Sequence, residues 1–204
     1  MPEYGKGRQA GQRNMYVVGA YKEQLLDELR NNTDFQLALL GGELSQDLTP
    51  KQVKKSFENN VFDYAFTPGT TTEDRIFVCM EVTCPYADAV TWKDLYIHIY
   101  VFTPKMSVSW NDEKEDDVRI SSMLEQRGYI GNKIDMIVDV IDRKINGFKN
   151  LALGSIKLSP REGMQVFSYI DGYYGKQLTY SATDFNLLPS EEIRNMHYNG
   201  AVDG

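Results

Sequence analysis

The sequence predicts an α+β domain in which an antiparallel sheet carries a long helix and an N-terminal helix on one face. The stretch GNKIDMIVDVIDRKING (131–147) repeats apolar residues at the spacing of one helix face. The stretch KDLYIHIYVF (93–102) alternates with the period of two that is typical of a strand. Helical patterns come first, then three strand patterns, then the long helix and further strands, and this order is typical of the α+β class.

The chain begins with a basic, glycine-rich stretch over residues 1–15 that has no apolar run of the secretory type. We expect a flexible arm that carries Lys6, Arg8 and Arg13. Residues 19–31 predict an amphipathic helix, whose apolar stripe is made by four residues: Tyr21, Leu25, Leu26 and Leu29.

Two more segments precede the sheet. Residues 35–40 form an apolar stretch that ends at Gly41-Gly42. LTPKQVKKSFENN then predicts a short helix, with Thr49 as its N-cap and Pro50 at its first position.

Three strands are expected next. VFDYAF (61–66) alternates and stops at Pro68-Gly69, and RIFVCMEVTCP (75–85) is apolar almost throughout, which indicates a central strand. The third strand is the 93–102 stretch. Because the connections are short, we expect a largely antiparallel sheet.

Residues 106–128 form a polar insert in which NDEKEDD places five acids in seven residues. We expect a solvated loop, and loops of this length in compact domains are usually functional or disordered. The long helix follows, with Asn132 as its cap and Gly147 as its terminator.

Two further strand regions close the domain, at ALGSIKLSP (152–160) and at residues 164–185, with turn signals at Asp171-Gly172 and at Gly175. We therefore expect one domain over residues 16–186 and a C-terminal extension over 187–204.

Charge and cysteine content exclude several classes. A net charge of −7 disfavours binding to the phosphate backbone of a nucleic acid. The sequence contains no run of about 20 apolar residues, so no membrane span is predicted. Cys79 and Cys84 are five positions apart, so they face opposite ways along a straight strand and are expected as free thiols. Neither these cysteines nor the two histidines have zinc-ligand spacing, so we expect no metal and no cofactor.

Catalytic patterns are weak. The sequence has no nucleophile elbow and no phosphate loop, and His98 lies in the middle of a strand. The most concrete enzyme hypothesis is a metal nuclease that uses Asp63 and Glu81 on adjacent strands. Such nucleases place a lysine two positions after the glutamate, where this chain has Thr83. We therefore expect a protein without catalytic activity.

The 93–102 strand has two apolar faces. One face carries Leu95, Ile97, Ile99 and Val101, and the other carries Tyr96, His98, Tyr100 and Phe102. The long helix is expected to cover the first face. The second is covered either by a neighbouring subunit or by the chain's own residues 35–60, and the sequence leaves both possibilities open.

The order of elements and the phrases LYIHIYVF and KIDMIVDVIDRKING resemble the tail terminator, or tail completion, proteins of long-tailed phages. The resemblance covers residues 19–31, 61–103 and 132–180. It implies a structural virion protein assembled in the host cytoplasm, usually as a hexameric ring, at the head-proximal end of the tail. DNA would pass through the lumen without specific binding, and an acidic wall would avoid adhesion.

In this interpretation Tyr96, His98, Tyr100 and Phe102 form the subunit interface. The basic arm and the acidic insert would contact the tail tube, the sheath or the head-tail connector, and the insert residues concerned are Asp112, Glu113, Glu115, Asp116 and Asp117. Three alternatives remain at this point: another connector or stopper subunit, the Asp63/Glu81 nuclease, and a monomeric binding module whose own fold covers Tyr96 and Tyr100.

Overall fold

The computed structural model describes residues 19, 22–40, 50–64, 75–83, 95–150, 154–167 and 171–183. The predicted arm, Thr49, Cys84 and the C-terminal extension lie outside these residues. No helix within the described ranges is both long and apolar enough to cross a membrane.

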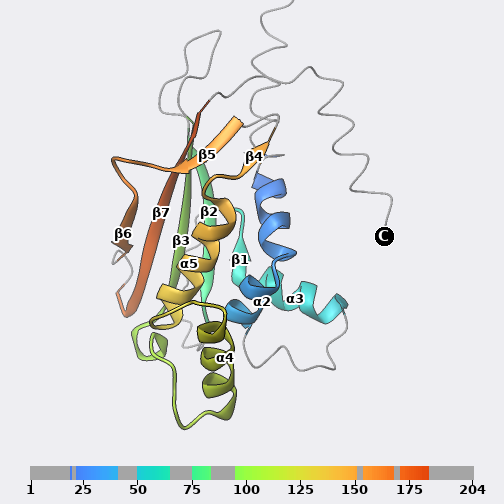
Figure 1. Ribbon diagram of the computed structural model, residues 1–204, viewed down its shortest axis with the longest axis vertical. Coiled ribbons are helices and arrows are strands. Elements are labelled where there is room, and N and C mark those ends of the chain that lie inside the picture. The colour runs from blue at the N-terminus through green and yellow to red at the C-terminus, as the bar shows by residue number, and fades with distance from the viewer. Residues whose placement is uncertain are drawn as a thin grey trace, which may run out of the picture.

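A seven-stranded sheet forms the body of the protein, in the order β1-β2-β3-β7-β5-β4, with β6 also paired to β7 (Figure 1). β2 to β7 pair antiparallel, as expected, whereas β1 runs parallel to β2. The strands are β1 Val61–Phe62, β2 Phe77–Thr83, β3 Leu95–Pro104, β4 Lys149–Asn150, β5 Gly154–Leu158, β6 Met164–Phe167 and β7 Tyr173–Thr183.

The helices pack on one face of this sheet, which confirms the α+β class. They comprise a helix over residues 22–30, α2 Thr33–Leu40, α3 Pro50–Asn60, α4 Glu115–Gln126 and α5 Lys133–Ile145, with a 3-10 turn, η2, at Lys105–Ser107. One core joins Leu25, Phe35, Ile120 and Ile137 to the sheet residues Ile97 and Ile99. Figure 1 shows α5 lying along the sheet with α2 beside it.

Helix α5 has the predicted form. Ile134, Ile137, Val138, Ile141 and Ile145 are all buried. The Asn132 side chain accepts a hydrogen bond from the Asp135 backbone at 2.9 Å, and the Asp135 carboxylate accepts in return from the Asn132 backbone, which makes a capping box. Gly147 has a φ of 85°, as expected of a helix terminator.

The acidic insert is not the expected loop. Its residues 115–126 form α4, which buries Ile120 and Leu124 one helical turn apart in the core. Three acids, Glu115, Asp116 and Asp117, occupy the first turn, where negative charge stabilises a helix. The same charges that indicated a loop therefore support a helix start.

Two smaller expectations were also wrong, and one short strand was missed. β1 is only two residues long, and Asp63 and Tyr64 already form a bend. The short strand β4 was not foreseen. Gly175 does not make a turn but lies within β7, opposite Phe102, whereas the turn at Asp171-Gly172 is present and Gly172 has a φ of 80°.

The described parts of residues 35–60 belong to the helix-covered face. Phe35, Ala38, Leu39 and Phe57 are buried in the same core as Ile97 and Ile99. Their apolar side chains pack into the main core on that side of the sheet, so these segments do not cover the face that carries Tyr96.

Candidate functional site: the open face of the sheet

The face of the sheet opposite the helices has an aromatic end and a polar end. Alternation along the strands places Phe77, Cys79, Glu81 and Thr83 of β2 on this face, beside Phe102, Tyr100, His98 and Tyr96 of β3. β7 adds Gly175, Gln177, Thr179 and Ser181 to the same face. We call this surface the open face.

The aromatic end is a small second core. Phe77 and Phe102 stack with ring centroids 5.5 Å apart, and Tyr173 meets Phe102 edge-on at 5.9 Å. Both phenylalanines are 1% exposed. Phe102 is therefore buried within its own chain, which leaves Tyr96, His98 and Tyr100 as the half-buried members of the predicted interface row.

The polar end centres on His98, which contacts side chains from both neighbouring strands. Thr83 Oγ1 lies 2.8 Å from the imidazole Nε2, and Thr179 Oγ1 lies 3.2 Å from Nδ1. Gln177 Nε2 donates to Thr179 Oγ1 at 3.2 Å and lies 3.4 Å from His98 Nδ1. Both ring nitrogens thus face hydrogen-bonding groups, and the ring is held between the planes of Tyr96 and Tyr100.

Burial lowers the pKa of His98, because the charged imidazolium loses hydration on this sheet. The negative charges of Glu162 and Glu81 act in the opposite direction and partly offset the effect. His98 is therefore a neutral, positioned histidine at neutral pH.

Glu162 lies in the short loop between β5 and β6, and its charge acts on His98 of the open face. Thr179 of β7 pairs with both ends of the loop over residues 159–163. Ser159 N donates to Thr179 O at 2.8 Å, and Thr179 N donates to Gly163 O at 2.8 Å. Gly163 N closes the loop on Ser159 O at 2.9 Å, which leaves Glu162 in the part that protrudes.

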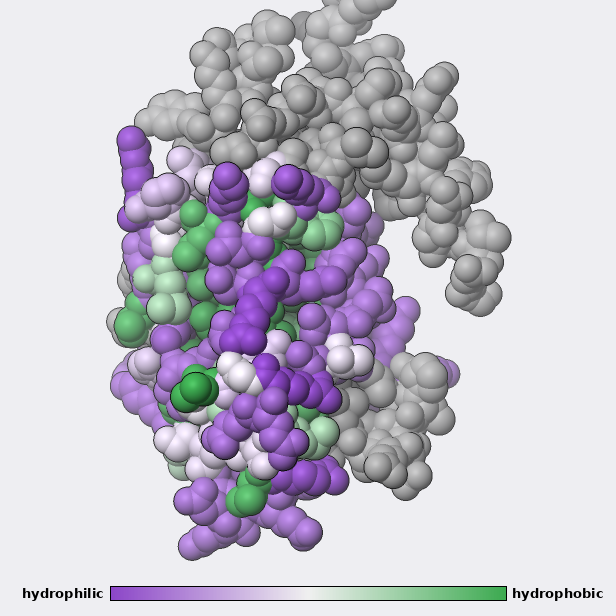
Figure 2. Space-filling view, viewed as in Figure 1, coloured by the Kyte–Doolittle hydropathy of each residue, from purple (hydrophilic) through white to green (hydrophobic). Residues whose placement is uncertain are grey.

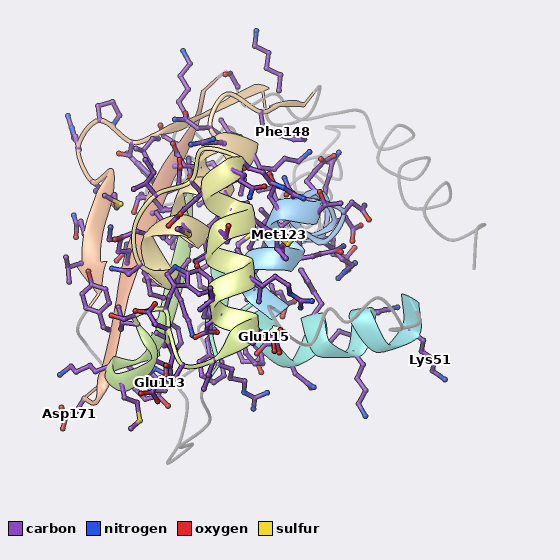
Figure 3. All side chains as sticks on the ribbon, turned by 60° about the horizontal axis from the view of Figure 1, so that its bottom comes forward. Lys51, Glu113, Glu115, Met123, Phe148 and Asp171 are labelled. Atoms are coloured by element: carbon purple, nitrogen blue, oxygen red, sulfur yellow. The ribbon has the colours of Figure 1, made fainter. Side chains whose placement is uncertain are left out.

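The acidic residues assigned to partner contacts divide into two groups. Asp112, Glu113, Glu115 and Asp116 are exposed. Figure 3 shows Glu113 and Glu115 at the end of the molecule where α4 begins. Asp117 instead pairs with Lys133 at 2.7 Å, with both side chains largely covered, and accepts from Asn111 N at 3.0 Å. Its role is to fix the start of α4 against α5. Lys6, Arg8 and Arg13 lie outside the described residues.

The carboxylates of the nuclease hypothesis have different surroundings. Asp63 is exposed in the bend after β1, and Glu81 lies 3.6 Å from the ammonium of Lys22. Within the described part of the chain, no three His, Cys, Asp or Glu side chains form a group that could hold a metal ion.

Sequence reasoning did not identify Thr83, Gln177, Thr179 or Glu162 as neighbours of His98. The strand register explains this, because Thr179 is 81 positions away in sequence from His98. Thr83 entered the sequence argument only as the position where a nuclease would carry lysine. The signal that could have found these residues is the polar alternation Gln177, Thr179, Ser181 along the last strand.

The fold and the open face define an α+β protein with one helix-covered face and one face that presents a row of half-buried aromatic and imidazole rings. The chain belongs to the YomW family, whose pattern it matches over residues 23–182. Membership of this family indicates a phage-encoded protein. None of the curated proteins matches the sequence.

Proposed function

We propose that this phage-encoded protein is a structural virion protein, a tail terminator-like subunit that forms a ring at the head-proximal end of the tail and has no catalytic activity. The observation that carries the proposal is the row Tyr96, His98 and Tyr100, which is half-buried and lies on the face opposite the described helices. Tyrosine rings of this kind are enriched in protein interfaces, because they bury a large apolar area and retain a polar tip.

In the proposed ring, this row contacts the neighbouring subunit. A contact between different surfaces of successive copies closes into a ring when the rotation allows it. Six copies, with the net charge of −7 on each chain, give an acidic wall past which DNA moves without adhesion. The exposed acids Asp112, Glu113, Glu115 and Asp116 and the N-terminal arm then remain for the tail tube, the sheath or the connector.

The mass of the purified protein in solution tests the ring. Light scattering over a concentration series is expected to give a closed species near six times the 23.3 kDa subunit mass. The variant Tyr100→Arg is expected to remove it, because an arginine head group would enter the contact without a partner. Ile130→Arg is the matched control, since Ile130 is 82% exposed and lies off the open face. A strict monomer at every concentration, also with tail tubes present, would contradict the ring.

Binding to purified virion parts separates a terminator from another connector or stopper subunit. A terminator is expected to sediment with tail tubes, and a stopper with heads that carry the connector. The double variant Asp112→Lys/Glu113→Lys is expected to weaken this binding, whereas Glu23→Lys, an exposed acid on the helix over residues 22–30, leaves it unchanged. Equal binding by both variants would remove the insert from the contact.

The proposed lack of catalysis has its own test. Incubation with DNA and magnesium is expected to leave the DNA intact. If the parent protein cleaves the DNA and the Glu81→Ala variant does not, the nuclease hypothesis replaces the structural proposal.

A further inference from the structure

Among the residues that the structure describes, the strand β6 lies at an edge of the sheet. Within the described residues it pairs only with β7, in the register Met164 with Leu178, Gln165 with Gln177, Val166 with Lys176 and Phe167 with Gly175. Figure 1 places β6 at the outer margin of the molecule, beyond β7. No other described strand pairs with its outer side.

The hydrogen-bond pattern shows which backbone groups face outward. Thr179 N donates to Gly163 O, so Gly163 and every second residue after it direct their backbone groups to β7. Gln165 then faces β7, and Met164 and Val166 direct their N–H and C=O groups away from the sheet. This edge thus offers two donors and two acceptors, spaced for an antiparallel strand.

The side chains at this edge favour pairing. Val166 is 62% exposed and Met164 is 51% exposed, and both lie on the helix side of the sheet, where α5 does not cover them. Figure 2 shows hydrophobic side chains at the surface along this margin. The sequence MQVF contains no charge and no proline, two of the features by which exposed edge strands avoid pairing.

We propose that β6 is a contact site for a second copy of this chain, with the two β6 strands antiparallel about a two-fold axis. One register pairs all the outward groups: Met164 of one copy lies opposite Val166 of the other, and the two Gln165 residues face each other on the axis. The strand is complementary to itself in this register. On one face the two Met164 and two Val166 side chains cover each other, and on the other face the two Gln165 amides can each donate and accept.

Self-complementarity in this register is the reason to favour a second copy, and the charge of the strand does not oppose it. Two chains with a net charge of −7 each repel one another at most contacts, and β6 is an uncharged stretch on which they can meet without placing like charges together. The contact does not depend on the ring. By itself it gives a two-fold dimer, and together with a ring contact it joins two rings. A pair of four-residue strands buries far less than a standard interface, so the dimer is expected to be weak and concentration-dependent.

Cysteine cross-linking tests the register directly. Residues that face each other in a non-hydrogen-bonded antiparallel pair have Cα atoms about 4.5 Å apart, within the range of a disulfide. Gln165→Cys is therefore expected to give a covalent dimer on mild oxidation. Met164→Cys is the matched control, because the two Met164 positions are offset along the strands beyond the reach of a disulfide, more than about 7 Å. The unmodified chain, with its buried Cys79, serves as the background.

The expected result is a covalent dimer for Gln165→Cys, several times more abundant than for Met164→Cys or the unmodified chain, and its loss when Val166→Lys is added. Equal cross-linking at positions 164 and 165, or none at 165 in a folded variant, would overturn the inference. The two proposals fail separately: a hexamer without the 165 cross-link removes only the β6 contact, and a 165 cross-link in a protein that forms no ring removes only the ring.

Discussion

Gly175 of β7 lies directly opposite Phe102 of β3, so closely that a side chain does not fit at position 175. A Cβ atom added there would lie 2.5 Å from Phe102 Cβ and 2.2 Å from Val101 O. The glycine allows the Phe102 ring to pack with Phe77 and Tyr173 at the aromatic end of the open face. The absent side chain is therefore part of the packing of the second core.

Replacing Gly175 with alanine is expected to destabilise the protein. The added methyl must displace backbone and Phe102, and overpacking of this kind costs about 1–3 kcal/mol. Urea unfolding followed by fluorescence measures the effect. Gly19→Ala is the control, since a Cβ there meets nothing within 4 Å. Equal midpoints for the two variants would show that the strands separate without cost.

Helix α4 is expected to contribute to the stability of the whole domain, although it comes from the polar insert. Leu124 is fully buried in the main core, so Leu124→Ala is expected to lower the free energy of unfolding by about 2–5 kcal/mol. Val118, on the same helix, is 45% exposed, and Val118→Ala is expected to change it by less than about 0.5 kcal/mol. If both variants unfold like the parent protein, α4 is not part of the cooperative unit.

The cap of α5 gives a third prediction. Asn132→Ala removes the acceptor for the Asp135 backbone N–H and is expected to cost about 1 kcal/mol, measured by chemical denaturation. Asn132→Ser retains a capping oxygen and is expected to be close to neutral. A similar loss for serine and alanine would mean that the side-chain bond is not what stabilises the helix start.

The sequence predicts the parts of this fold in which local pattern and tertiary packing agree. In α5 the spacing of Ile134, Ile137 and Ile141, the cap at Asn132 and the terminator at Gly147 all indicate the same helix. α4 was missed because only Ile120 and Leu124 reach the core, and two apolar residues in a charged stretch are a weak periodic signal.

Gly175 and His98 show why the other features of the fold and of the open face could not be predicted from local sequence. They depend on tertiary contacts. Glycine in a sequence indicates a turn as readily as a close approach of two strands, and only the register with Phe102 distinguishes them. The neighbours of His98 come from β2, from β7 and from the loop before β6, so no local pattern could have assembled them. The four residues of the predicted interface row lie on one face of the sheet, as expected. Phe102 is nevertheless buried within its own chain, because Phe77 and Tyr173 pack against it.

The stability of the protein is expected to depend on pH through His98. The pKa of His98 is lowered from its ordinary value of 6.5 by burial, so below that value the unfolded chain binds a proton that the folded chain resists. Stability is therefore expected to fall as the pH drops below 6.5, towards the lowered pKa of the folded state. The negative charges of Glu162 and Glu81 raise the pKa of His98 and so reduce the size of this loss, but they do not reverse its sign.

His98→Gln is expected to remove this part of the pH dependence, because the amide can still bond to Thr83 and Thr179 but does not titrate. Urea midpoints of the two proteins compared at about pH 8 and about pH 5 isolate the contribution, since His197 is the only other histidine and is present in both. The parent protein should lose more stability on acidification than the variant. If the variant loses as much, the His98 imidazole titrates as it does in water, and the polar end of the open face does not hold it in the neutral form.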